Sequence, residues 1–383
     1  MNRREWLIAT GATVLAAHPA LQALAAAAPE RDNTPLSWPP YDKMLVIDGC
    51  GGLGRWGGPA DRSLDAQTLE DARASGVDAV VLTLAPSGRF WFGDEGYQTT
   101  LRELAHWDRQ LALHPDHLMQ VLTADDLTRS AETGKFGLIY GFQDTSPLGE
   151  DLDRIAMYRE RGVRVIQLTH NRRNLVGDGC MEPGNAGLSN FGKLVIEGLE
   201  SQRILVDLSH AGRRTAMESV QASKRPLVFS HTGCAALSDV PRCMPDDILR
   251  AMADRGGVAG MIFWPYLRKQ GQPTSDDLIR HIEHAINVCG EDHVGLGTDA
   301  SVSPVERTPE FEAQNREWVT YMLEIGFFEA GNTPELYTFI PDLNHARRLE
   351  TLGALLSRRG HSQTRIAKLM GGNFARVMRE VWG

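Results

Sequence analysis

Five polar residues each follow a short apolar run, and their chemistry is that of a metal-assisted hydrolase. Gln143 follows GLIYGF, His170 follows VRVIQLT, His210 follows ILVDLS, His231 follows PLVFS and Asp299 follows HVGLGT. Apolar runs of this kind are typical of buried parallel strands. Polar residues at the ends of successive strands form the active site of a (β/α)8 barrel. The pattern therefore predicts a barrel enzyme that uses metal to hydrolyse its substrate.

Two of these residues are the strongest metal-ligand candidates. His210 and His231 end strands that we expect to be neighbours. Adjacent strands lie about 5 Å apart, so both imidazoles could reach one ion at about 2.0–2.1 Å. Spacing alone leaves a second interpretation open, in which the two histidines are hydrogen-bonded and bind no metal.

The elements that must position these residues are eight strand candidates separated by helical patterns. The candidate strands span 45–48, 78–84, 137–142, 164–169, 204–208, 226–230, 257–263 and 293–298. The clearest helical patterns span 152–162, 191–202, 246–257 and 275–290. This alternation predicts an α/β fold, a (β/α)8 TIM barrel of the metal-dependent hydrolase type, with insertions after strands 2 and 8. A doubly wound sheet is the alternative, but no GxGxxG or GxxxxGK[ST] loop follows the first strand.

The first 28 residues resemble a twin-arginine export signal. Arg3 and Arg4 precede a mild apolar stretch that His18 and Pro19 interrupt. This interruption argues against a stable transmembrane helix, although a membrane anchor or an amphipathic tail remains the alternative. We therefore predict a periplasmic protein exported by the twin-arginine route.

Composition and net charge limit the possible domain organisation, partners and structural metal sites. Residues 29–43 are Pro-rich and polar and predict a linker, which leaves 44–383 as a single domain. The net charge of −9 argues against a nucleic-acid partner. Five cysteines are present without a CxxC pair, which argues against a zinc knuckle. We expect a small-molecule partner, and a homodimer is left open.

Several segments resemble the membrane (renal-type) dipeptidase family of zinc peptidases, within the amidohydrolase-like barrels. They include LTHN, LSNFGK, VDLSH and FSH, and the similarity covers most of the chain after the leader. By position, the resemblance implies metal binding by His210 and His231 and substrate binding by His170. It also implies carboxylate binding by Arg242 and proton transfer by Asp299.

The chain departs from the family where the second zinc would bind. The HxD pair of the family falls at Cys50 and Gly52, and its bridging Glu falls at Gln143. Glycine has no ligating side chain, and an amide oxygen is a poorer ligand than a carboxylate, so Gln143 is a weak metal candidate. We expect one zinc or none, with Asp299 as a further ligand, while Cys50 or Cys180 could add a thiolate.

Three functions are consistent with these residues. The first is hydrolysis of a small amide, such as a dipeptide with a free carboxylate, by a single-zinc dipeptidase-like enzyme. The second is a tailoring enzyme for a peptide-derived metabolite. The third is a catalytically inactive homologue that binds a carboxylate ligand.

Overall fold

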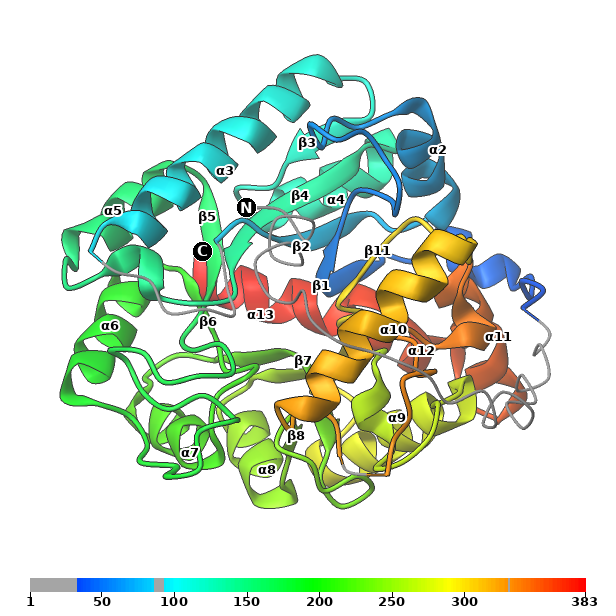
Figure 1. Cartoon of the computed structure of the whole chain (residues 1–383). Coiled ribbons are helices and arrows are strands. Elements are labelled where there is room, and N and C mark those ends of the chain that lie inside the picture. The colour runs from blue at the N-terminus through cyan, green and yellow to red at the C-terminus, as the bar shows by residue number, and fades with distance from the viewer. Residues whose placement is uncertain (1–32, 86–92, 330) are drawn as a thin grey trace, which may run out of the picture. The chain divides into compact units, whose positions relative to one another are not determined.

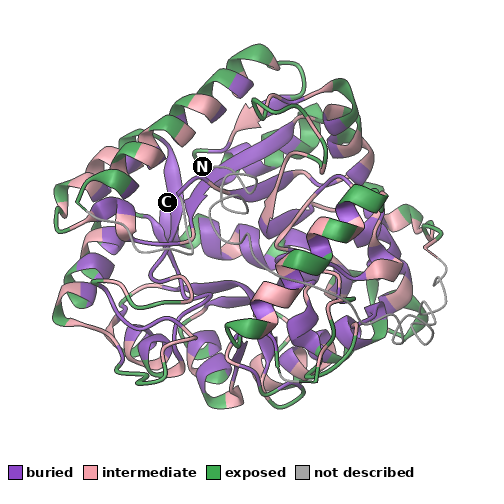
Figure 2. Cartoon of the chain, in the orientation of Figure 1, coloured by how far each residue is buried: buried purple, intermediate pink, exposed green. Residues whose placement is uncertain are grey.

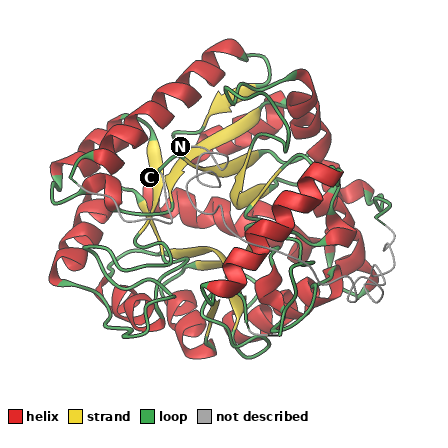
Figure 3. Ribbon diagram, in the orientation of Figure 1, coloured by secondary structure: helices red, strands yellow, loops and turns green. Residues whose placement is uncertain are grey.

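A curled parallel sheet forms the centre of the fold (Figures 1 and 3). The computed structural model describes residues 33–85, 93–329 and 331–383. Residues 1–28, for which we predict an export signal, lie outside the described residues. The strands are β1 (Ile47–Gly52), β2 (Ala79–Thr83), β3 (Leu118–Gln120), β4 (Phe136–Phe142), β5 (Val163–Gln167), β6 (Leu205–Asp207), β7 (Val228–Cys234), β8 (Cys243–Met244), β9 (Val258–Met261), β10 (Val294–Leu296) and β11 (Ala300–Ser301).

Strand order follows chain order around the sheet. The order is β10-β9-β7-β6-β5-β4-β2-β1-β11, with β3 added beside β4 and β8 beside β7, and the pairings are parallel. A doubly wound sheet reverses its strand order in the middle, so that alternative is excluded. The chain passes from β10 at one end of this order to β11 at the other end within residues 297–299. All eight predicted strands overlap observed ones, and the α/β, TIM-barrel-like architecture is confirmed.

Helices surround the sheet (Figure 1). They are α2 (Ala66–Ser75), α3 (Glu95–Leu113), α4 (Ala124–Thr133), α5 (Asp153–Glu160), α6 (Asn190–Ser201), α7 (Arg213–Ala222), α8 (Asp246–Asp254), α9 (Ser275–Cys289), α10 (Pro309–Glu324), α11 (Arg348–Arg358), α12 (Gln363–Ala367) and α13 (Asn373–Trp382). The four predicted helical patterns correspond to α5, α6, α8 and α9. Most strand residues are buried, and many exposed residues lie on the outward faces of the helices (Figure 2).

The last helix, α13, packs against the inner face of the sheet. Its apolar side chains form a buried cluster with inward-facing strand residues such as Ile47 and Val258. Phe374 fits there because glycines leave room for its ring. A Cβ atom on Gly49 or Gly295 would lie 2.5 or 2.6 Å from that ring, which is closer than real Cβ contacts. Glycine at these positions is therefore a packing requirement.

The segment predicted as a linker contacts the body of the protein where the structure describes it. The backbone N–H groups of Leu36 and Trp38 donate to Thr351 Oγ1 and Glu350 Oε1 at the start of α11. Tyr41 is buried and its hydroxyl donates to the carbonyl of Ser75. Within the described ranges, no helix combines the length and apolar character needed to cross a bilayer.

Candidate functional site

The carboxyl edge of the sheet gathers all six residues that the sequence singled out. Gln143 directly follows β4, His170 and His210 follow β5 and β6 by three residues, and His231 lies within β7. Arg242 immediately precedes β8, and Asp299 lies between β10 and β11.

The three histidines are in direct contact. The rings of His170 and His210 stack with their centroids 4.1 Å apart, and His210 Nε2 lies 2.9 Å from His231 Nε2. Ligand atoms of His231, Cys50 and Asp299 also form a group in which all lie within 4.8 Å of one another. Gln143 Nε2 donates to Cys50 Sγ at 3.0 Å, which joins Gln143 to the same cluster.

A buried carboxylate orients the ring of His231. Asp207 Oδ2 accepts from Ser230 Oγ at 2.5 Å, and Asp207 Oδ1 accepts from Ser209 Oγ at 2.8 Å. Ser230 Oγ has one hydrogen and gives it to Asp207, so it accepts a hydrogen from His231 Nδ1, 2.8 Å away. Asp207 and Ser230 are not among the site residues predicted from the sequence. The carboxylate three residues before His210 was the available signal.

Hydrogen bonds at Nδ1 of His210 and His231 leave the Nε2 atom of each ring without a hydrogen and with an available lone pair. His210 Nδ1 lies 2.6 Å from the amide oxygen of Asn171 and must carry the hydrogen. His231 Nδ1 carries its hydrogen toward Ser230, so the two Nε2 atoms present lone pairs to each other across 2.9 Å. A cation removes this repulsion, because two nitrogens that share a zinc ion lie about 3.3 Å apart at a tetrahedral angle. The donor set therefore fits a single metal ion, and outer partners of this kind commonly orient metal-binding histidines.

Protonation does not relieve the repulsion near neutral pH. Burial, with the charge of Arg242 adding to it, holds the pKa values of His210 and His231 well below the usual 6.5. Burial and the charges of Arg242 and Arg172 lower the pKa of His170 to about 3. All three imidazoles are therefore neutral at pH 7, which is the state in which an imidazole can bind a metal ion.

Arg242 is a buried cation beside these neutral rings. It is 2% exposed, and its Nη2 donates to the carbonyl oxygen of His231 at 3.2 Å. Its Nε and Nη1 atoms have no hydrogen-bond partner among the described residues, and neither has the hydroxyl of neighbouring Tyr266. A buried cation is costly unless it is paired, so the site is suited to an anionic ligand group.

Two residues of the cluster hold a left-handed backbone. His210 has φ 64° and Asp299 has φ 53°, a conformation that costs a non-glycine residue about 1–3 kcal/mol and is concentrated at functional sites. Asp299 is held there by its neighbours. Thr298 donates its N–H and its hydroxyl to the buried carboxylate of Asp48, and the indole N–H of Trp264 donates to the carbonyl oxygen of Asp299.

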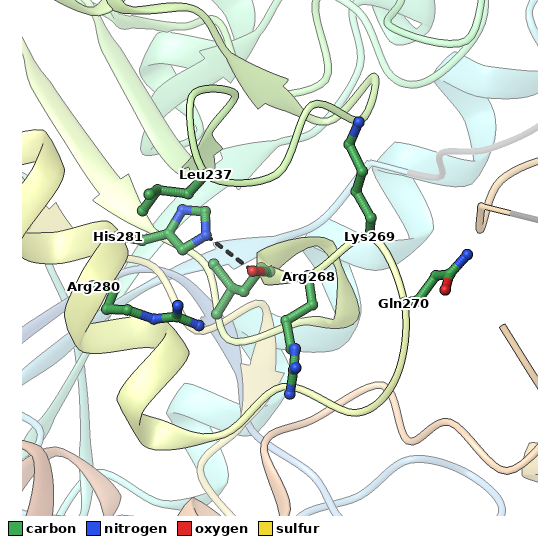
Figure 4. Close-up of a pocket in the computed structure, with 7 residues that line it drawn as sticks. Leu237, Arg268, Lys269, Gln270, Arg280 and His281 are labelled. Carbon is green, nitrogen blue, oxygen red and sulfur yellow. Dashed lines mark hydrogen bonds between the residues drawn. The ribbon is translucent and has the colours of Figure 1, made fainter. Parts of the chain in front are cut away.

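A separate cavity of about 260 Å³ contains basic side chains (Figure 4). Arg268, Lys269 and Arg280 line it, together with His281, which donates to the carbonyl oxygen of Leu267 at 3.0 Å. None of its lining residues belongs to the histidine cluster, and none is among the site residues predicted from the sequence.

Comparison with known proteins identifies the family. The sequence profile of the membrane dipeptidases, peptidase family M19, matches residues 59–312. The chain belongs to the membrane dipeptidase family. The expected resemblance is thus confirmed.

Individual relatives agree with this assignment. Dipeptidase tcpJ of Claviceps purpurea is 25% identical over 326 residues, which cover 83% of this chain and 69% of that protein. An uncharacterized dipeptidase of Schizosaccharomyces pombe is 32% identical over 208 residues, which cover 52% of this chain and 50% of the relative. The crystal structure of an amidohydrolase from Pseudomonas aeruginosa superposes with a TM-score of 0.75 at 28% identity, covering 90% of this chain and 98% of the other. The chain is accordingly a dipeptidase-like hydrolase of a metallopeptidase family.

Proposed function

We propose that this membrane dipeptidase family member is an exported hydrolase that uses one metal ion, zinc, to cleave a dipeptide-like amide with a free carboxylate. The observation that carries the proposal has two parts. The buried imidazoles of His210 and His231 are in contact with their lone pairs opposed, and the buried guanidinium of Arg242 beside them is incompletely paired. His210 and His231 would hold the ion, on a (β/α)8 scaffold. When bound there, a metal ion supplies a nucleophilic water of lowered pKa and polarises the scissile carbonyl.

The other residues would orient the substrate and move protons. His170 is neutral at pH 7 and can donate a hydrogen bond to the carbonyl oxygen, where negative charge develops. Asp299 faces the cluster and would accept a proton from the attacking water and return it to the leaving amine. Arg242 would pair with the terminal carboxylate through the guanidinium atoms that the protein leaves unpartnered.

The departures from the two-zinc pattern support a second candidate. Cys50, Gly52 and Gln143 replace the ligands that a second ion needs, while the carboxylate-binding arginine remains. A tailoring enzyme that acts on a peptide-derived metabolite, or a binding protein without catalysis, would also keep Arg242. Turnover of unmodified dipeptides by the purified zinc-loaded protein distinguishes hydrolysis from both alternatives.

Carboxylate recognition by Arg242 can be measured directly. Lysine cannot form the bidentate contact of arginine, and loss of a charged hydrogen bond costs about 1.5–3 kcal/mol. We expect Arg242→Lys to bind a dipeptide-like inhibitor with a free carboxylate about 10-fold to 100-fold more weakly by calorimetry. The C-terminally amidated inhibitor should bind poorly to both proteins.

A matched arginine serves as the control for this measurement. Arg214 is exposed and pairs with Glu218 on the surface of α7, so Arg214→Lys should leave both affinities unchanged. Equal binding of the acid and the amide by the wild-type protein would refute carboxylate recognition.

Export depends on residues outside the described part of the chain. Replacing Arg3 and Arg4 with lysine should retain the precursor in the cytoplasm, because the twin-arginine pair is the feature that this route recognises. Immunoblotting of periplasmic and cytoplasmic fractions measures the distribution. An unchanged periplasmic level would exclude the twin-arginine route.

A further inference from the structure

The thiol of Cys50 lies where a metal held by His231 could bind it. Cys50 is on β1 and is 3% exposed, and His231 on β7 is fully buried. Three possible ligand atoms lie within 4.8 Å of one another: the sulfur of Cys50, a ring nitrogen of His231 and a carboxylate oxygen of Asp299. Since His231 Nδ1 bonds to Ser230, Nε2 is the ring nitrogen available to an ion. His210 is not part of this group, and it contacts His231 through Nε2.

The amide of Gln143 complements the sulfur. Gln143 Nε2 donates to Cys50 Sγ at 3.0 Å, and an N–H donor stabilises negative charge on a sulfur. A glutamate at position 143 would instead place a carboxylate against a thiolate, and the two charges would repel each other. The cysteine at position 50 and the glutamine at position 143 are therefore mutually compatible, which explains two departures from the family pattern as one change.

We infer that Cys50 is a thiolate ligand of the single metal ion that His231 binds, and that Gln143 is a donor to its sulfur and not a ligand. This inference rests on the metal centre of the proposed function. On binding, the S–H bond of Cys50 breaks, a sulfur–metal bond forms and the proton leaves to solvent, with no change of oxidation state. A thiolate beside an imidazole selects zinc over magnesium or manganese.

Cobalt substitution tests the inference without measuring activity. Co²⁺ takes the place of zinc in such sites, and a cobalt–thiolate bond gives an intense charge-transfer absorption in the near ultraviolet that oxygen and nitrogen ligands do not give. We expect one equivalent of Co²⁺ to produce this band in the wild-type protein. Cys50→Ser should lose the band and should bind zinc at least about 10-fold to 100-fold more weakly, which is the loss that even an outer partner causes.

A second cysteine provides the matched control. Cys180 Sγ lies 3.3 Å from Asn171 Oδ1, the atom that also contacts His210, so it is the other thiol close to the cluster. Cys180→Ser should keep the full band. A band that persists in Cys50→Ser, or that disappears in Cys180→Ser, would overturn the assignment of Cys50.

The same titration separates this inference from the proposed function. Wild-type protein that holds one Co²⁺ without a charge-transfer band would reject the thiolate ligand and leave the metal centre in place. Wild-type protein that retains neither zinc nor Co²⁺ after dialysis would reject both. These outcomes come from the unmodified protein, so they do not depend on whether a variant folds.

Discussion

A variant with both His210→Ala and His231→Ala is expected to retain no zinc after dialysis, whereas the wild-type protein retains at most one equivalent per chain. The two Nε2 atoms lie 2.9 Å apart and are both oriented by hydrogen bonds at Nδ1, so the double variant removes the two nitrogens best placed to bind one ion. The loss should exceed the 10-fold to 100-fold weakening that removal of an outer partner causes. Elemental analysis of the purified mature protein gives the stoichiometry.

Two further variants calibrate this result. Ser230→Ala removes the partner of His231 Nδ1 without removing a ligand, so zinc affinity should fall about 10-fold to 100-fold and no more. His284→Gln changes a histidine that pairs with Asp246 and lies outside the cluster, and zinc content should not change. Zinc that survives in the double variant would reject the site assignment, and two equivalents in the wild type would reject the single-metal proposal.

The second large effect is a gain of function. Cys50→His, Gly52→Asp and Gln143→Glu together restore the ligands that the family pattern places at these positions. We expect the triple variant to bind a second zinc about 3.5–4 Å from the first and to hydrolyse dipeptides faster than the wild type. Adding Asp299→Asn should reduce the gained rate about 10²–10⁴-fold, the usual contribution of a positioned acid–base group.

The backbone at position 52 allows this test. The φ angle of Gly52 lies outside the left-handed region, and a Cβ there would come within 4.0 Å of only Leu82 Cδ1. An aspartate therefore fits without backbone strain. Metal content and dipeptide turnover are measured on the same preparation, after circular dichroism has shown that the variant is folded. A folded triple variant with no second zinc would show that the β1 edge serves another chemistry, and would favour the tailoring or binding alternatives.

Local signals were sufficient for eight of the strands and for the residues that follow them, whereas the short strands β3, β8 and β11 were not predicted. The apolar runs before His170, His210, His231 and Asp299 identify buried strands because a parallel sheet is covered on both faces. The carboxyl ends of parallel strands meet at one edge of the sheet, and the structure places these side chains together at that edge. The family resemblance added Arg242, which no strand pattern would have selected.

Other features of the site depend on contacts between distant segments and could not be read from the sequence. The carboxylate of Asp207 fixes the ring of His231 across two strands, and Asn171 fixes His210 from the loop after β5. Asp207 lies three residues before His210, but the type and spacing of Asp207 and Asn171 resemble those of many structural polar residues, so this signal alone does not assign their roles. Composition likewise predicted a linker over 29–43, whereas the contacts of Leu36 and Trp38 with α11 join residues more than 300 positions apart.

The position of α13 at the end of the chain determines when the core can form during synthesis in the cell. The interior apolar surface of the strands is completed by Phe374 and its neighbours, which the ribosome adds more than 300 residues after β1. Until α13 emerges, Ile47, Val258 and the other inward-facing residues have no cover, so the nascent chain exposes a hydrophobic surface of the kind that chaperones bind. The core beneath the active-site edge is thus completed only after every residue of the site has been synthesised, and we expect chaperones to bind a chain truncated before α13.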